Sequence, residues 1–246
     1  MDFTFFYVAA VSFIATLVRS TLGFGESLIA VPLLIVILPV TVAVPLSVLL
    51  SIVIALVVVI QDHRKIHLYS AKWLIFFALL GIPLGLLLLV YGSENQVKFG
   101  LGAAITGYAL YALWKKNGLQ LKTDHKGWLF ACGFLSGILG GAYGLNGPPL
   151  IVYGNMRQWD AKQFRATLQA YFLPVSFAGV IGYWIKDLLN ADVFRYFMVA
   201  LPAAIPAIFL GRYLNHRLNN ESFFRYVYVG LLCIGISILF GAFNGH

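Results

Sequence analysis

Long apolar segments recur along this chain, each close to the length that an α-helix needs to cross the hydrocarbon core of a bilayer. Seven such segments are predicted, at Phe3–Leu22, Val40–Ile60, Trp73–Val90, Val97–Trp114, Phe164–Ile185, Val193–Leu210 and Phe224–Phe240. The chain is 61% hydrophobic and 11% charged, whereas soluble domains contain roughly 45–50% apolar and about 25% charged residues. The sequence therefore predicts an all-α integral membrane protein.

Other protein classes are disfavoured by composition. The net charge of +8 fits basic cytoplasmic loops, and no basic stripe outside short loops indicates nucleic-acid binding. Cys132 and Cys233 lie in apolar segments and are interpreted as small buried hydrophobic residues. The histidines show neither metal-ligand spacing on an apolar helix nor an HExxH motif. We therefore expect no metal, no cofactor and no enzymatic activity.

The two halves of the chain resemble each other. Residues 23–35 read GFGESLIAVPLLI and residues 140–152 read GGAYGLNGPPLIV, so that Gly23 aligns with Gly140 and Pro32 with Pro149. Further pairs follow in the same order, Ile82-Pro83 with Ile205-Pro206 and Glu94 with Glu221. This order predicts a duplication, with a first membrane repeat at 1–118, a cytoplasmic linker at 119–126 and a second repeat at 127–246.

Each half opens with a segment that glycine interrupts, at Gly23–Ser27 and at Gly140–Pro149. Paired interruptions of this kind mark the binding site of many transporters, because non-helical backbone at membrane depth must line a cavity or be buried in protein. A short helix after each break would direct N–H groups and a positive dipole end at an anion. The alternative is close helix packing, which the four-residue spacing of Gly133, Gly137 and Gly141 favours for those residues.

These motifs resemble the TauE/SafE family of sulfite and sulfonate exporters. The resemblance covers the whole chain, including its length, its two halves and both glycine-rich breaks, each with proline nine residues after its first glycine. The stretch DAKQFRAT at 160–167 also looks like the family's sequence before the next helix. Glu26-Ser27, Tyr143 and Asn146 depart from the usual glycine-rich pattern. The resemblance implies movement of sulfur oxyanions or organic sulfonates across a membrane.

Two charged residues, Arg19 and Glu26, lie well inside the first opening segment. A charge at the bilayer centre costs about 2.5–3.5 kcal/mol on insertion scales. The pair flanks the first break, so the chain could fold back and bring the two side chains together. In one interpretation Arg19 attracts the anion and Glu26 carries a coupling proton. In the other, the two residues form a static ion pair that braces the break, and both interpretations stay open at this stage.

Polar side chains and glycines near the breaks complete the predicted substrate site, because hydroxyl and amide groups can donate to oxyanion oxygens. With Arg19, the predicted set is Ser20, Thr21, Gly23, Gly25, Ser27, Tyr143, Gly144, Asn146 and Gly147. A second tier lies at the start of the following helix, at Arg165, Thr167 and Gln169. The competing interpretations are hydroxyl bonds to the helix's own backbone and, for Arg165, snorkelling to the interface.

Two topologies are compatible with the segments. If each opening segment spans the membrane, the chain makes eight crossings with parallel halves, and nine Lys and Arg lie inside against seven outside. If each opening segment is a re-entrant hairpin, each half has three further crossings and the halves are inverted. Thirteen Lys and Arg then lie inside, in loops at 62–72, 115–126, 154–165 and 212–225, against three outside. The positive-inside rule favours the inverted repeats.

The combined prediction is a multi-pass secondary transporter of the inner or plasma membrane. It would export small sulfur-containing anions, with proton coupling as one option for its driving force. The alternatives are an anion channel and a membrane assembly factor without transport activity. The predicted partners are a small-molecule anion and membrane lipid, and a homodimer is left open.

Overall fold

The computed structural model describes residues 3–114, 120–159 and 161–215, together with 229, 232, 233, 235, 236 and 238–241. Its α-helices are α1 (Phe3–Leu22), α2 (Glu26–Leu34), α3 (Val40–Asp62), α4 (Leu68–Tyr91), α5 (Glu94–Trp114), α6 (Lys126–Tyr143), α7 (Gly147–Met156), α8 (Ala161–Ile185) and α9 (Ala191–Asn215). A short 3-10 helix, η1 (His63–Lys65), joins α3 to α4. No strand occurs among the described residues.

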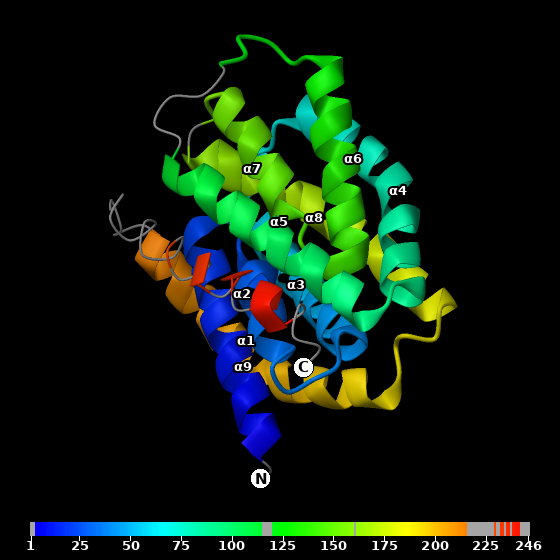
Figure 1. Ribbon diagram of the computed structural model, residues 1–246. Helices are drawn as coiled ribbons and strands as arrows, with labels where there is room; N and C mark the ends of the chain where they lie inside the picture. Colours follow the sequence, from blue (N-terminus) through cyan, green and yellow to red (C-terminus); the bar gives the residue numbers. More distant parts are fainter. Residues whose placement is uncertain are drawn as a thin grey trace.

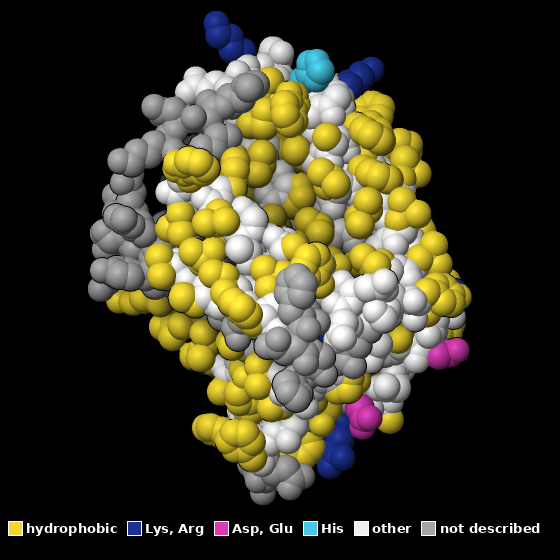
Figure 2. All heavy atoms as spheres, viewed as in Figure 1, with side chains coloured by type: hydrophobic (Ala, Val, Ile, Leu, Met, Phe, Trp, Pro, Cys, Tyr) yellow, Lys and Arg dark blue, Asp and Glu magenta, His cyan; other side chains and the backbone are white. Residues whose placement is uncertain are grey.

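Five of these helices, α1, α3, α4, α8 and α9, are long and apolar enough to cross a membrane. They coincide with five of the seven predicted spans, so the prediction of an all-helical, multi-pass membrane protein is confirmed. The predicted segment Val97–Trp114 lies within α5, which is not among the five. The predicted segment Phe224–Phe240 and the predicted boundary at 118–119 lie largely or wholly outside the described residues. In Figure 2 hydrophobic side chains cover the flanks, whereas charged side chains gather toward the two ends.

The helices pack in pairs that join residues far apart in the sequence. Helix α4 packs along α6, α1 along α9, and α3 along α8. Glycine permits the closest of these approaches, because a Cβ at Gly137 would overlap the carbonyl oxygen of Ala78, and one at Gly85 would overlap that of Ile138. Gly133 and Gly141 lie on the same face of α6, against α4. The close packing interpreted from their spacing is therefore present in the structure.

Both opening segments fold back on themselves. Tyr7 Oη, near the start of α1, donates a hydrogen bond of 2.9 Å to the Leu33 carbonyl oxygen near the end of α2. Ahead of α6, the Leu121 N–H donates to the carbonyl oxygen of Met156, the last residue of α7, at 2.7 Å. Each short helix thus returns toward the end at which its hairpin began. Figure 1 shows α1 entering from the end where the N-terminus lies and α6 entering from the opposite end.

A polar cluster ties the second hairpin to the start of α4. The carboxylate of Asp124 accepts hydrogen bonds from Ser70 Oγ at 2.7 Å, from Arg157 Nε at 3.0 Å and from the hydroxyl of Tyr153. Burial opposes the ionisation of Asp124, but the two hydroxyl donors and the charge of Arg157 outweigh it and lower the pKa of this carboxyl. The segment before α6, the end of α7 and the start of α4 therefore meet at one end of the molecule.

Candidate functional site

Both opening helices end at glycines with left-handed backbone. Gly23 and Gly25 have φ of 88° and 96°, and Gly144 has φ of 70°. Side chains with a Cβ rarely adopt this conformation, so these positions favour glycine. Helix α2 begins directly after Gly25, and α7 begins at Gly147. Neither start has a side-chain cap, which leaves their first N–H groups and positive dipole ends available to a ligand.

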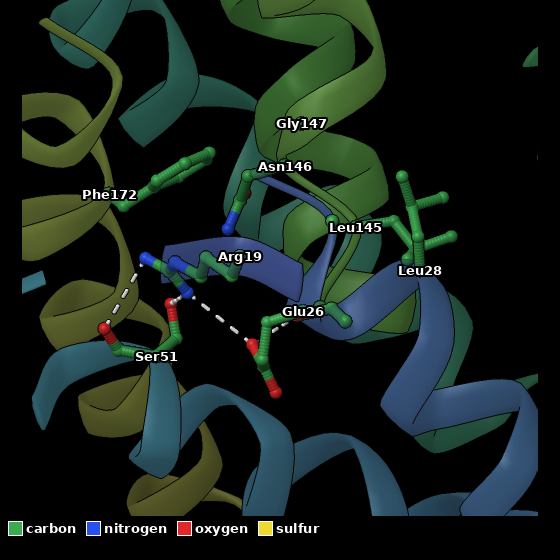
Figure 3. Close-up of a pocket in the computed structure, with 11 residues that line it drawn as sticks. Arg19, Glu26, Leu28, Ser51, Leu145, Asn146, Gly147 and Phe172 are labelled. Carbon is green, nitrogen blue, oxygen red and sulfur yellow. Dashed lines mark hydrogen bonds and ion pairs between the residues drawn. The ribbon is translucent and has the colours of Figure 1, made fainter. Parts of the chain in front are cut away.

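The two breaks meet around one cavity, shown in Figure 3. Its lining comes from both breaks, from α3 and from α8, and consists of Arg19, Gly25, Glu26, Ser27, Leu28, Ser51, Gly144, Leu145, Asn146, Gly147 and Phe172. Seven of the predicted site positions are among them: Arg19, Gly25, Glu26, Ser27, Gly144, Asn146 and Gly147. The open space is about 20 Å³, which is room for about one water molecule.

Arg19 is the central cation of this cavity and is only 3% exposed. Its Nη1 donates to Ser51 Oγ at 2.7 Å and lies 3.4 Å from Glu26 Oε2, while its Nη2 donates to Gln169 Oε1 at 2.9 Å. Its guanidinium carbon lies 4.7 Å from the ring centre of Phe172, in a cation–π contact. Its Nε has no hydrogen-bond partner among the described residues. The guanidinium is thus held in place but keeps one donor unused.

Glu26 is 1% exposed and is the acidic member of the cavity. Its Oε1 accepts a hydrogen bond from Ser47 Oγ at 2.9 Å, and its Oε2 accepts one from Ser27 Oγ at 3.0 Å. The two hydroxyl oxygens also lie 2.9 Å from each other. Both carboxylate oxygens therefore have neutral donors in addition to Arg19, so the carboxyl group has polar partners even when Arg19 is engaged elsewhere.

Asn146 brings a neutral polar group from the second break. Figure 3 shows its side chain directed toward Arg19. Its Oδ1 is buried and has no hydrogen-bond partner in the described part of the chain. Its backbone carbonyl is fixed by Ser136 Oγ at 2.6 Å, and Ser136 in turn accepts from Tyr171 Oη at 2.8 Å. The amide is therefore positioned by its backbone and can present either its oxygen or its NH₂ to a ligand.

Two predicted hydroxyls near Arg19 do not line the cavity. Ser20 packs in the contact between α1 and α9, where a Cβ at Gly211 would lie 2.5 Å from its own Cβ. Thr21 Oγ1 donates to the carbonyl oxygen of Leu17 at 2.7 Å, one turn back in the same helix. This is the backbone bond that competes with ligand binding for hydroxyls in membrane helices.

Two more predicted residues lie outside the cavity. The hydroxyl of Tyr143 lies against Gly100 of α5. Thr167 Oγ1 accepts a hydrogen bond from the backbone N–H of His67 at 2.9 Å, which joins α8 to the residue before α4. Their contacts are with other helices.

The remaining predicted residues surround the first break from α8. Gln169 Nε2 donates to the Gly23 carbonyl oxygen at 2.8 Å, and its Oε1 accepts from Arg19. Arg165 lies one turn earlier on α8, with its Cβ 3.2 Å from where a Cβ of Gly23 would be. Gln169 thus contacts both the break and its cation, whereas Arg165 lies outside the cavity lining.

Sequence reasoning missed Ser47, Ser51 and Phe172. The serines are four residues apart on the otherwise apolar helix α3 and so share one face. That spacing was the available signal. Nothing in the sequence near Phe172 distinguishes it from the other aromatic residues of a membrane helix.

The fold defines a multi-pass helical membrane protein with a charged, buried cavity between two broken helices. The model of the family described as Sulfite exporter TauE/SafE matches residues 8–238, and the chain belongs to this family. The family resemblance inferred from the sequence is thereby confirmed.

A curated relative, the probable sulfite/organosulfonate exporter TauE of Cupriavidus necator, is 26% identical over 166 residues. These residues are 66% of this chain and 64% of the relative, so the match spans slightly less than two thirds of that protein. No solved structure matches the chain.

Proposed function

We propose that this protein is a secondary transporter of the inner or plasma membrane that exports small sulfur-containing anions, such as sulfite or organosulfonates. The observation that carries the proposal is the convergence of Arg19 and the starts of α2 and α7 on one buried cavity. Broken helices whose N-termini face a common point at membrane depth are how many secondary transporters bind anionic groups. The family membership supports the same substrate class.

The donors of the cavity suit a tetrahedral or pyramidal oxyanion. Arg19 offers its unused Nε, Asn146 offers an amide, and the two helix starts offer backbone N–H groups. Charge-assisted hydrogen bonds from guanidinium to oxyanions are stronger than neutral ones. A sulfur oxyanion has several heavy atoms and exceeds the present space of about 20 Å³. Binding therefore requires the two hairpins to separate, as alternating access would provide.

The charges of the cavity provide a reason for proton coupling. Arg19 and Glu26 face each other at 3.4 Å, so an ionised pair leaves little net charge. A bound anion then adds a negative charge in a buried site, which is unfavourable unless a proton neutralises Glu26. Ser27 and Ser47 remain as partners of the protonated carboxyl. Anion and proton would thus bind with mutual stabilisation, which is the linkage that a proton-coupled exporter needs.

The positions of the loops support the inverted topology. The ion pair of Arg157 with Asp124 at 3.0 Å, and the hydrogen bond of Thr167 with His67 at 2.9 Å, join segments at one end of the molecule. Eight crossings would place 115–126 and 154–165 on opposite sides of the membrane, and likewise 62–72 and 154–165. Two re-entrant hairpins place all of them together. We assign this end to the cytoplasm because it carries most of the basic loops.

The helix pairs support the proposed duplication into repeats at 1–118 and 127–246. Exchanging the halves converts α1 into α6 and α9 into α4, so the α1–α9 contact becomes the α6–α4 contact. The α3–α8 contact maps onto itself, and α3–α9 exchanges with α4–α8. These are the relations expected of two repeats that pack about a pseudo-two-fold axis.

Flux measurements with the purified protein in liposomes test the proposal. Sulfite and a short alkyl sulfonate are compared with acetate, in the presence and absence of an imposed proton gradient. Protein-dependent flux of the sulfur anions that can be driven uphill by the gradient supports a coupled transporter. Flux that only follows the anion's own gradient selects an anion channel. An absence of flux for every anion refutes transport and leaves a membrane assembly factor.

A further inference from the structure

A second buried arginine, Arg165, lies beside the first break but outside the cavity. It is 5% exposed. Its stem packs on Gly23, which has left-handed backbone and no side chain to displace it. The other charge beside it is Asp62 at the end of α3, whose Oδ2 is 3.6 Å from Nε. Neither Nε nor Nη2 of Arg165 has a hydrogen-bond partner among the described residues.

Unused donors on a buried guanidinium are unfavourable. A buried donor without an acceptor costs about 1–3 kcal/mol, and more when it is charged. The separation of 3.6 Å from Asp62 exceeds the usual length of a charge-assisted hydrogen bond. The side chain of Asp62 is 24% exposed, so it can turn toward water. An oxyanion that reached Arg165 would satisfy these donors better than Asp62 does.

Arg165 and Arg19 are connected through the break. Gln169, one turn after Arg165, donates to the Gly23 carbonyl oxygen at 2.8 Å and accepts from Arg19 at 2.9 Å. Arg165 packs against that same glycine from outside the cavity. The two guanidiniums therefore lie on either side of a thin partition made of Gly23 and the side chain of Gln169.

The surroundings of Arg165 attract anions. Arg212, near the end of α9, is close enough for its positive charge to act on Arg165. Arg64 and Lys65 of η1 are exposed and directly follow α3. Clustered positive charge at the mouth of a site raises the local concentration of anions and speeds their entry. This end of α3 and α8 is thus suited to receive the ligand from water.

We propose that Arg165 forms a second anion site, which binds the sulfur oxyanion before it passes Gly23 and reaches Arg19. Asp62 occupies the guanidinium when no anion is bound and is displaced when one arrives. The inference rests on the proposed transport function, and it adds an entry site with its own arginine and its own competing carboxylate. Each arginine then has a carboxylate partner that the anion replaces, Glu26 in the cavity and Asp62 at the entrance.

A purely structural role for Arg165 predicts the opposite effect of one substitution. If the ion pair with Asp62 only braces the start of α8, Asp62→Asn leaves Arg165 unpaired and weakens the protein and its transport. If Asp62 competes with the anion, Asp62→Asn removes the competitor and strengthens sulfite binding. The sign of the change in apparent affinity therefore separates the two roles.

The first test measures sulfite flux into proteoliposomes at varied sulfite concentration. Asp62→Asn should lower the half-saturating concentration severalfold, and Arg165→Gln should raise it about tenfold, as the loss of one charge-assisted contact implies. Arg165→Lys should lie between wild type and Arg165→Gln. Arg64→Gln, an exposed charge at the same end, is the matched control and should change the value less than twofold. A raised value in both single variants that Asp62→Asn with Arg165→Gln restores would show a brace and overturn the entry site.

The second test separates this inference from the proposed function by equilibrium binding of sulfite to the detergent-solubilised protein. Residual binding in Arg19→Ala that disappears on adding Arg165→Gln supports the second site. Complete loss in Arg19→Ala, with Arg165→Gln equal to wild type, overturns the second site and retains the proposed function. No sulfite binding in any form overturns both. Elution as a single peak in size-exclusion chromatography confirms that each variant is folded.

Discussion

Substitutions at Arg19 and Glu26 distinguish proton coupling from simple bracing of the first break. Glu26→Gln keeps the shape of the side chain and removes its charge, as protonation does. Arg19 then retains Ser51, Gln169 and the ring of Phe172 as partners. The substitution exchanges one charged contact at 3.4 Å for a neutral one, so we expect a loss of stability of about 1–3 kcal/mol. The variant should therefore fold.

Arg19→Ala is more disruptive. It leaves the Ser51 hydroxyl and the Gln169 carbonyl oxygen without their donor, and Glu26 without its counter-charge. Removal of one partner from a buried ion pair typically costs about 3–5 kcal/mol. The loss of a charge-assisted contact of about 1.5–3 kcal/mol should weaken sulfite binding at least about tenfold. We expect Arg19→Ala protein to be less stable and to lose binding at the cavity.

The assay compares uphill and downhill movement of sulfite in proteoliposomes. Glu26→Gln should still exchange sulfite down its gradient, with a flatter dependence on pH, but should not accumulate it in response to a proton gradient. Ser27→Ala is the matched control, because it removes one hydrogen bond to Glu26 and keeps the carboxyl group. It should keep uphill transport. Folded Glu26→Gln protein with undiminished uphill transport would refute the role of Glu26 in coupling.

The bracing alternative makes its own prediction. If the pair only stabilises the break, both single variants should express poorly. The double change Arg19→Met with Glu26→Gln, which leaves no unpaired charge, should then recover expression. Recovery of folding without recovery of sulfite binding would show that Arg19 both stabilises the break and binds the anion.

Three further predictions concern the cavity, the topology and the loop carboxylate. Gly147→Leu should fill the cavity without steric conflict and abolish the stabilisation by sulfite, which is about 2.7 kcal/mol at a hundredfold excess over Kd; Gly107→Leu, in open space, should keep the shift in Tm. Cysteines at Lys122 and Gln158 should be labelled by an impermeant reagent from the same side, and labelling from opposite sides would exclude the hairpin model. Asp124 has a lowered pKa in the folded state, so its stabilising contribution is present above its unfolded pKa and is lost as pH falls through the folded value. The acid-induced loss of stability should therefore be smaller in Asp124→Asn, as measured by thermal unfolding between about pH 5 and pH 2.

Much of the fold could be predicted because its signals are local. The apolar run Phe3–Leu22 gave the bounds of α1 without change, since a membrane helix is specified by continuous hydrophobicity. The breaks were located because glycine is the residue that tolerates left-handed backbone, as at Gly25 and Gly144. The contact between α4 and α6 was partly visible in the spacing of Gly133 and Gly137.

The site was predicted less completely because its members come together through tertiary packing. Ser20 follows Arg19 directly in the chain, but successive helix positions are about 100° apart around the axis, so Ser20 packs on α9 rather than in the cavity. Ser51 contacts Arg19 from 32 positions away, and Gln169 from 150 positions away. Such contacts depend on how α3 packs against α8, which no local pattern in one sequence specifies.

The two hairpins have similar backbones but contribute different chemistry to the cavity. The first supplies the charged pair Arg19 and Glu26, whereas the second supplies the amide of Asn146 and the start of α7. Asn146 depends on the break itself, because a Cβ at Gly140 would overlap its Oδ1. In the proposed mechanism the first hairpin therefore neutralises the anion and carries the proton, and the second adds neutral donors that shape the site. A ligand held between unlike hairpins must lose the contacts of one when the two separate, which gives each half of the transport cycle a different set of bonds to break.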